Sequence, residues 1–222
     1  FNEDAYHSGA VYVFERVDGN WTETAYLKAS NTEANDKFGE SVAINGNIIV
    51  VGAIGEDSNS QVINAGEADN SFVNSGAVYV FEYDTTDWYQ KAYLKPFNND
   101  SDPGTNEGYA FGSSVGISGN TIVVGARYED DNSTVINQLG SDKEYDSGAV
   151  YVYTTTNGNE WNHDTYLKPH NTSGGDHFGY KVAIDYNTIV VAAWLEDGDF
   201  TGVDLSNSII DDSLENSGAV YV

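Results

Sequence analysis

Three segments of the chain concentrate oxygen-bearing side chains at a fixed spacing. We call these segments the acidic loops; they are residues 54–74, 127–146 and 194–216, and they hold 17 of the 35 Asp and Glu residues. In each of them a Glu-Asp pair begins at the third residue. From that Asp onward, side-chain oxygens recur at every second position. Because alternate side chains of a curved backbone can converge on one hard cation, this spacing is typical of calcium loops. The sequence therefore predicts calcium binding in the acidic loops.

The predicted calcium ligands occupy the same phase in each acidic loop. A later carboxylate, Asp69 or Asp142, lies twelve residues after the first Asp in two loops, and Asp211 or Asp212 is the candidate in the third. No loop has the full EF-hand pattern, because the terminal Glu is missing. The candidate ligands are Asp57, Asn59, Gln61, Asp69, Asp130, Asn132, Thr134, Asp142, Asp197, Asp199, Thr201 and Asp211.

A second interpretation of the acidic loops stays open at this point. A rim of solvated carboxylates needs negative charge but no fixed spacing, whereas the three loops keep the same phase. The fixed phase favours calcium, and bound cations would also relieve the mutual repulsion of a net charge of −26. Asp36 and Asp176 each lie two residues before a Phe-Gly pair, and we expect them to cap a turn rather than to bind metal.

Composition and charge exclude several classes of partner. The chain has 9 Lys and Arg residues against 35 Asp and Glu residues. Because a surface with this excess of negative charge repels phosphate backbones and anionic lipid headgroups, we expect no nucleic-acid partner. No apolar run approaches the roughly 18 residues of a membrane span, so we expect no membrane insertion. The absence of Cys excludes a thiolate nucleophile and Cys-ligated zinc.

The residues that carry most enzyme chemistry show no pattern that indicates a catalytic site. The four His residues do not share a repeat phase, and none has metal-ligand spacing to a Glu or a second His. Carboxylate pairs occur throughout, so no pair stands out as a general acid and base. Trp21, Trp88 and Trp161 share one phase, which favours packing over sugar stacking; Trp194 breaks that phase and is the aromatic residue to test as a ligand contact. The sequence predicts no enzymatic activity.

Internal repetition is the strongest signal in the sequence. Ser-Gly-Ala-Val-Tyr-Val begins at Ser8, Ser75, Ser147 and Ser217, which gives a unit of about 70 residues. Tyr-Leu-Lys, Phe-Gly and Ile-Val-Val recur at matched positions in each unit. The chain therefore divides into the end of one repeat and three further repeats, the last one truncated: 1–37, 38–110, 111–177 and 178–222.

Each unit contains four short apolar runs separated by Gly, Asn, Asp and Ser. Residues 41–44 and 48–53 flank Asn-Gly-Asn, which predicts a tight hairpin, and residues 76–82 and 88–95 predict a third and a fourth strand. Along 77–81 both alternate positions are apolar, so this strand needs cover on both faces. Four antiparallel strands covered on both faces are typical of a propeller blade. The sequence predicts an all-β fold of β-propeller blades, with a β-solenoid as the alternative.

Two segments of the first full repeat carry a family resemblance. Phe-Gly-Glu-Ser-Val-Ala-Ile at 38–44 and Ile-Val-Val-Gly-Ala at 49–53 resemble an FG-GAP repeat, the blade unit of the integrin α-subunit propeller and of many bacterial surface proteins. Residues 111–126 are equally similar, and 178–193 lack one Gly of the pattern. The resemblance covers essentially the whole chain. It implies a β-propeller in an extracellular adhesion or scaffold role.

The chain departs from the family pattern in two places. Ile54, Arg127 and Trp194 replace the final Pro of the family name. The integrin-type calcium loop, which follows the Phe-Gly strand, is reduced here to three residues such as Asn-Gly-Asn, too short to wrap a cation. The chain thus resembles a shorter bacterial variant of the repeat, and the integrin calcium position is not carried over to it.

These observations predict an extracellular, calcium-stabilised structural or adhesion protein, secreted or on the cell surface. Because about three units cannot close a ring of four to eight blades, we expect a segment of a longer chain or self-association with other repeats or chains, as arrays or filaments. A ligand-binding or glycan-binding module of integrin or lectin type is the alternative. A propeller enzyme is the third interpretation.

Overall fold

The computed structural model describes residues 5–98, 108–141, 143–204 and 213–222. Within these ranges the regular structure consists of strands, with no α-helix and hence none that is long and apolar enough to cross a membrane. The all-β prediction is confirmed. The strands are β1 (Val11–Val17), β2 (Asn20–Leu27), β3 (Phe38–Asn45), β4 (Ile48–Ala53), β5 (Ala77–Tyr83), β6 (Trp88–Leu94), β7 (Phe111–Ser118), β8 (Thr121–Ala126), β9 (Ala149–Thr154), β10 (Asn162–Leu167), β11 (Phe178–Asp185), β12 (Thr188–Ala193) and β13 (Ala219–Tyr221).

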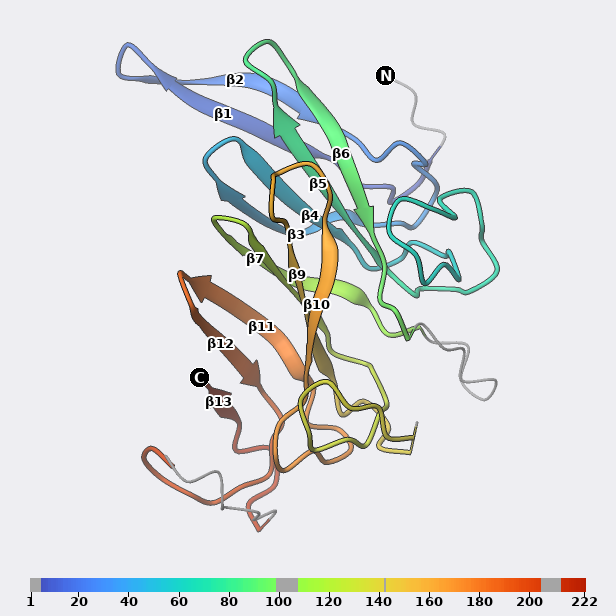
Figure 1. Ribbon diagram of the computed structural model, residues 1–222, viewed down its shortest axis with the longest axis vertical. Helices are drawn as coiled ribbons and strands as arrows, with labels where there is room; N and C mark the ends of the chain where they lie inside the picture. The colour runs from blue at the N-terminus through green and yellow to red at the C-terminus, as the bar shows by residue number, and fades with distance from the viewer. Residues whose placement is uncertain (1–4, 99–107, 142, 205–212) are drawn as a thin grey trace.

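The strands form four antiparallel sheets, stacked one on another along the long axis of the molecule (Figure 1). Two sheets are complete blades whose strands follow one another in chain order, β3-β4-β5-β6 and β7-β8-β9-β10. The two-stranded sheet β1-β2 lies at one end of the stack, and the three-stranded sheet β11-β12-β13 lies at the other. The predicted blade of four antiparallel strands is therefore confirmed, and over the described residues the stack does not close into a ring.

A two-residue turn fixes the first hairpin of each repeat. Asn45 pairs with Ile48 at the ends of β3 and β4, and Gly46 in the turn has a φ of 60°. A positive φ is easy for Gly and suits the turns that match the twist of a hairpin. In the third repeat Tyr186 takes this position with a φ of 49°. The hairpin is thus formed where the sequence predicted it, even where Gly is replaced.

In the first three repeated Ser-Gly pairs, the Gly joins one sheet to the next. Gly76 forms a parallel bridge with Phe111 of the following blade. A Cβ atom at Gly76 would lie 2.2 Å from the carbonyl oxygen of Phe111, so no other residue fits without a shift of the backbone. The same bridge connects Gly9 to Phe38 and Gly148 to Phe178. The repetition of this Gly therefore reflects the close approach of successive blades.

Each complete blade has two apolar faces of different composition. In the β3–β6 blade we define the aromatic face as Tyr79, Phe81 and Tyr93, and the valine face as Val50, Val78, Val80 and Leu94. All of these residues are at most 4 % exposed. The valine face packs against the aromatic face of the next blade, which is formed by Tyr151, Tyr153 and Tyr166. The prediction that these strands need cover on both faces is confirmed.

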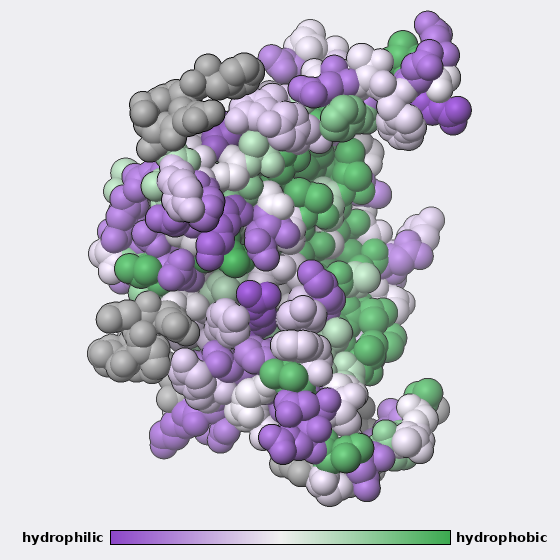
Figure 2. All heavy atoms as spheres, turned by 180° about the vertical axis from the view of Figure 1, so that it is seen from behind, coloured by the Kyte–Doolittle hydropathy of each residue, from purple (hydrophilic) through white to green (hydrophobic). Residues whose placement is uncertain are grey.

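The apolar and polar surfaces lie on different sides of the stack. Seen from behind, hydrophobic residues form a band along the strands, whereas hydrophilic residues cover most of the loop side (Figure 2). The acidic loops all follow the second strand of a sheet, and those of the two complete blades lie on the same side of the molecule (Figure 1). The fold therefore places the first two loops with predicted ligands on the same side of successive blades.

Candidate functional site

Each acidic loop begins with a Glu that points into the protein rather than toward solvent. Glu56 is 1 % exposed at the end of β4. Its Oε2 lies 3.0 Å from Nζ of Lys95, which follows β6, and its Oε1 accepts a 2.8 Å hydrogen bond from the Tyr93 hydroxyl. Lys95 also donates to the Ser75 hydroxyl and to the Gly76 carbonyl oxygen, at 2.7 and 2.6 Å. The three donors of the ammonium group are thus all used.

The second complete blade repeats this network residue for residue. Lys168 Nζ lies 3.0 Å from Glu129 Oε2, and Tyr166 donates to Glu129 Oε1 at 2.7 Å. Lys168 also donates to Ser147 and Gly148, both at 2.7 Å. A buried ion pair is tolerated only when its remaining hydrogen-bonding groups are satisfied, as they are in both blades. We call this arrangement the Lys–Glu network.

Burial and charge shift the pKa values of the groups in the Lys–Glu network. Burial lowers the pKa of Lys95, and the Glu56 carboxylate opposes that shift. Burial also raises the pKa of the Tyr93 hydroxyl, and the nearby Glu56 raises it further because a tyrosinate would repel the carboxylate. Tyr166 shows the same direction beside Glu129. Tyr93 and Tyr166 therefore stay neutral donors to a carboxylate, and the network holds the base of each acidic loop.

The sheets at the two ends of the stack each contain part of the Lys–Glu network. At one end of the stack, Lys28 donates to the Ser8 hydroxyl at 2.7 Å and to the Gly9 carbonyl oxygen. At the other end, Glu196 accepts a 3.0 Å hydrogen bond from Asn171, and the Ser217 hydroxyl donates to the Glu196 carbonyl oxygen. The first sheet therefore holds the Lys side of the network, and the last holds the Glu side.

The Asp that follows each of these Glu residues closes its loop. Asp57 Oδ1 accepts a 2.8 Å hydrogen bond from the backbone N–H of Asn74, near the far end of the first acidic loop. Asp130 and Asp197 accept the corresponding bonds from the N–H groups of Asp146 and Asn216, at 2.7 and 2.6 Å. Glu-Asp therefore has a structural role in each loop, and this role accounts for part of the fixed phase that predicted calcium.

Two further candidate ligands, one in each of the first two acidic loops, also make hydrogen bonds within their loops. Asp69 Oδ2 accepts from the N–H of Asn59 at 2.9 Å, and this bond lowers the pKa of Asp69. Asn132 Oδ1 accepts from the N–H of Ser141 at 2.9 Å. The loops are thus braced by the side chains that would bind the ion.

The other candidates lie on the loop surface or outside the described residues. Gln61, Thr134, Asp199 and Thr201 are exposed, and Asp142 and Asp211 lie outside the described ranges. Among the residues that the structure describes, no group of three or more His, Cys, Asp or Glu is placed to hold a metal ion. Calcium binding in the acidic loops stays a prediction.

The two Asp residues before Phe-Gly have the turn-capping role expected of them. Asp36 is 4 % exposed, and its Oδ2 accepts a 2.6 Å hydrogen bond from the N–H of Glu33. Asp176 accepts the equivalent bond from Ser173 at 3.1 Å. Burial raises the pKa of Asp36 to about 6, with smaller contributions from the Glu56, Glu33 and Asp57 carboxylates. These residues shape the turn that leads into each Phe-Gly strand.

The Trp residues of the shared phase are not equally buried. Trp161 is 5 % exposed between the two complete blades, in agreement with a packing role, whereas Trp21 is 71 % exposed on the end sheet. Trp194 is 50 % exposed and stacks on Tyr180 with ring centroids 4.9 Å apart. Arg127 lies 5.9 Å from the centre of the same Tyr180 ring. Trp194 therefore belongs to a surface aromatic cluster found in one repeat.

The Lys–Glu network was not predicted from the sequence, although its signal was present. Glu-Asp and Tyr-Leu-Lys each recur in phase, but Glu56 and Lys95 are 39 positions apart. Only the antiparallel order of the blade brings the end of β6 beside the start of the acidic loop. The pairing could have been inferred from the fact that a Glu and a Lys, of opposite charge, each recur once per repeat at a constant position.

Stacked four-stranded blades with a repeated internal network define a protein of β-propeller-type repeats. The profile of the FG-GAP repeat family matches residues 21–81, 101–153 and 161–222, which is most of the chain. The chain therefore belongs to the FG-GAP repeat family. No curated protein matched the sequence.

Proposed function

We propose that this chain is an extracellular structural or adhesion module that associates with further blades of its own kind, with calcium bound in the acidic loops. FG-GAP repeats are typical of extracellular and surface proteins, which supports the location. The proposal assigns no catalytic activity. The observation that carries it is a pair of complementary apolar faces that stay uncovered at the two ends of the stack.

The uncovered aromatic face lies on β1-β2. Tyr12, Phe14 and Tyr26 are 55, 54 and 50 % exposed. The matching residues of the next blade, Tyr79, Phe81 and Tyr93, are at most 4 % exposed. Fully burying one such aromatic side chain is worth about 1.5–3 kcal/mol, so this face favours a covering partner. Because its residue types are those of the inner aromatic faces, the partner of matching shape is a valine face.

The uncovered valine face lies on the last sheet. Val220 is 64 % exposed, whereas Val78 at the same position of an inner blade is 0 % exposed. Between inner blades, faces of this kind pack against aromatic faces. The aromatic face of one chain therefore matches the valine face of a second. Such a contact joins unlike surfaces, so it builds either a closed ring or an open filament.

The charge of the chain is consistent with calcium in this assembly. Stacking further copies would bring their acidic loops side by side, and each chain carries a net charge of −26. Bound divalent cations would reduce the resulting repulsion. We therefore propose that calcium promotes the stacking of blades as well as the stability of each loop.

A mixing experiment tests the head-to-tail contact. Trp21 pairs with Arg16, two positions after Phe14 on β1, so it lies on the same side of the sheet as the aromatic face. Trp21→Asp therefore places a charge on that face, and Val220→Asp places one on the valine face. Each variant alone has one intact face and is expected to be monomeric by light scattering, whereas an equimolar mixture is expected to form dimers. Val203→Asp is the matched control, since Val203 is 79 % exposed and lies in an acidic loop away from both faces. A mixture that stays monomeric contradicts the proposal.

A further inference from the structure

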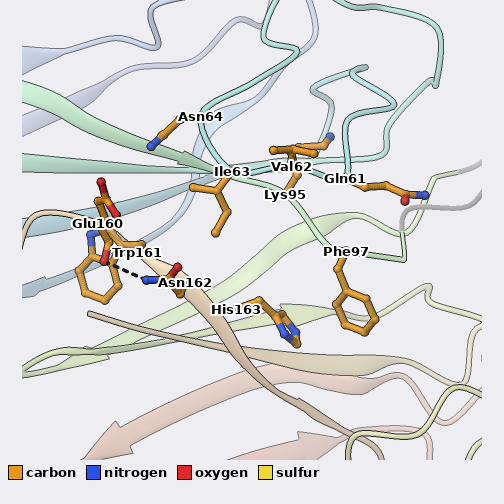
Figure 3. A pocket seen from close by; sticks show the side chains of 10 residues that line it. All are labelled: Gln61, Val62, Ile63, Asn64, Lys95, Phe97, Glu160, Trp161, Asn162 and His163. Carbon is orange, nitrogen blue, oxygen red and sulfur yellow. Dashed lines mark hydrogen bonds between the residues drawn. The ribbon is translucent and has the colours of Figure 1, made fainter. Parts of the chain in front are cut away.

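A pocket of about 410 Å³ lies where the two complete blades meet (Figure 3). One wall comes from the first acidic loop, where Ile63 points into the space. Phe97, which follows β6, and His163 on β10 lie together at one end, and Trp161 lies at the other (Figure 3). Glu160 is exposed beside Trp161. The volume falls within the range of about 300–1,000 Å³ that small-molecule sites occupy.

Two residues of the lining each carry a buried polar atom that has no hydrogen-bond partner within the described part of the chain. The atoms are Nε1 of Trp161 and Nε2 of His163. Trp161 is 5 % exposed as a whole. Burying a polar group without a partner is unfavourable, and most buried polar groups in proteins are satisfied. Two such atoms in residues that line one pocket make them candidates for hydrogen bonds to a ligand.

The aromatic pair in this pocket is not a feature of the repeat. At the preceding junction Ser30 holds the position of Phe97, and Gln90 holds that of His163. There the two residues satisfy each other: the backbone N–H of Ser30 donates to Gln90 Oε1 at 3.0 Å, and Gln90 Nε2 donates to the Ser30 hydroxyl at 2.9 Å. Here the Phe97 and His163 rings meet edge to face, with centroids 4.3 Å apart. The fold does not need this pair, so it marks a specific site.

The chemistry of the lining narrows the class of ligand. An indole N–H can only donate, so the ligand must offer an acceptor, which an ammonium group does not. Lys95 also lines the pocket, but its charge is matched by Glu56, so it does not attract an anion. The net charge of −26 repels anions further. Burial lowers the pKa of His163, which favours the neutral ring. The ligand is therefore uncharged and has both acceptors and donors.

We propose that this inter-blade pocket binds an uncharged saccharide. The apolar C–H face of a sugar ring packs against the aromatic and aliphatic walls, and its hydroxyl groups accept from the Trp161 N–H. A hydroxyl can either donate to or accept from His163 Nε2, so it suits both tautomers of the neutral ring. The inference goes beyond the proposed self-association and does not depend on it, because the pocket lies inside one chain.

The test follows the indole N–H resonances of the four Trp residues by two-dimensional NMR during titration with neutral disaccharides. Maltose, cellobiose, lactose and N,N′-diacetylchitobiose are the probes, and Trp161→Phe assigns the signal of Trp161. At least one sugar is expected to shift that signal in a saturable way, with a Kd of about 1 mM or below. If none of the four shifts it, or if choline or acetate shifts it and no sugar does, the proposal is overturned.

Three variants separate binding from folding. Trp161→Phe keeps the ring but removes the donor, and it is expected to weaken sugar binding by about tenfold, measured by calorimetry. Trp88→Phe, at the same phase of the preceding repeat, is the matched control and is expected to bind as the unmodified chain does. The double variant Phe97→Ser and His163→Gln rebuilds the Ser–Gln pair of the preceding junction, so it is expected to fold and to lose binding. A double variant that folds and binds normally contradicts the assignment.

Discussion

Replacing Lys168 by Met would leave Glu129 without its cation inside the second complete blade. The two charged groups are 3.0 Å apart, and both side chains are 0 % exposed. The substitution also removes donors to Ser147 and Gly148. Removing one partner of a buried pair costs about 3–5 kcal/mol, because the remaining charge stays buried. We expect Lys168→Met to lower the free energy of unfolding by this amount.

Urea unfolding, followed by circular dichroism and Trp fluorescence, measures the loss. Lys28→Met is the matched control, since Lys28 donates to the Ser8 hydroxyl and the Gly9 carbonyl oxygen in a partly exposed end sheet. Its expected cost is about 1–2 kcal/mol, the value of two hydrogen bonds. The double variant Lys168→Met and Glu129→Gln is expected to recover part of the loss, because a neutral amide needs no cation.

The pH dependence gives a second check on the same substitution. Without Lys168, the ionised carboxylate of Glu129 would be a buried charge with no cation, and neutralising it in acid removes that cost. The variant is therefore expected to lose more stability at neutral pH than in acid. The difference from the unmodified chain is expected to be smaller at acidic pH. A loss no larger than that of Lys28→Met, or one that does not change with pH, would refute the reasoning.

The remaining predictions concern calcium, a buried carboxyl and a blade junction. Removal of calcium with EDTA is expected to lower the melting temperature, and an unchanged melting temperature counts against calcium in the acidic loops. Asp36→Asn keeps the acceptor for the Glu33 N–H. Because burial raises the folded pKa of Asp36 from 3.8 to about 6, the unmodified protein loses stability as the pH rises through this interval. The variant should therefore be the more stable protein at neutral pH, with a gap that narrows in acid; a gap independent of pH would exclude this cause. Gly76→Ala should cost more than about 2 kcal/mol, because its Cβ would meet Phe111, whereas Gly19→Ala, also at positive φ but with open space around it, should cost about 1 kcal/mol. Equal losses in thermal or urea unfolding would contradict the packing argument.

The blade was predictable because its signals are local or repeated. The turn at Gly46 and the apolar run along β5 each depend on a few consecutive residues, and they recur in every unit. The roles of the charged residues at the start of each acidic loop could not be predicted, because they depend on tertiary contacts. In the sequence, Glu56 stands near the start of a predicted calcium loop, whereas its carboxylate pairs with Lys95 in the interior. Asp57 appeared as a first calcium ligand and closes its loop.

The residues of the pocket could not be identified from the sequence, because they vary between repeats. Phe97 and His163 belong to different repeats, and each occupies a phase that varies between units. In a sequence dominated by matched landmarks, residues that vary between units carry no signal of their own. Only the packing of one blade on the next brings them within 4.3 Å, between ring centroids, and leaves Trp161 Nε1 without a partner in the described residues.

The mass of the 222-residue chain in solution tests most directly whether its blades associate through their uncovered faces. Sedimentation velocity over a concentration series, in buffer with calcium, is expected to give a mass that rises above the 24.1 kDa of one chain as the concentration increases. Trp21→Asp is expected to return the mass to that of one chain. A mass of 24.1 kDa at every concentration, with calcium present, would contradict the account.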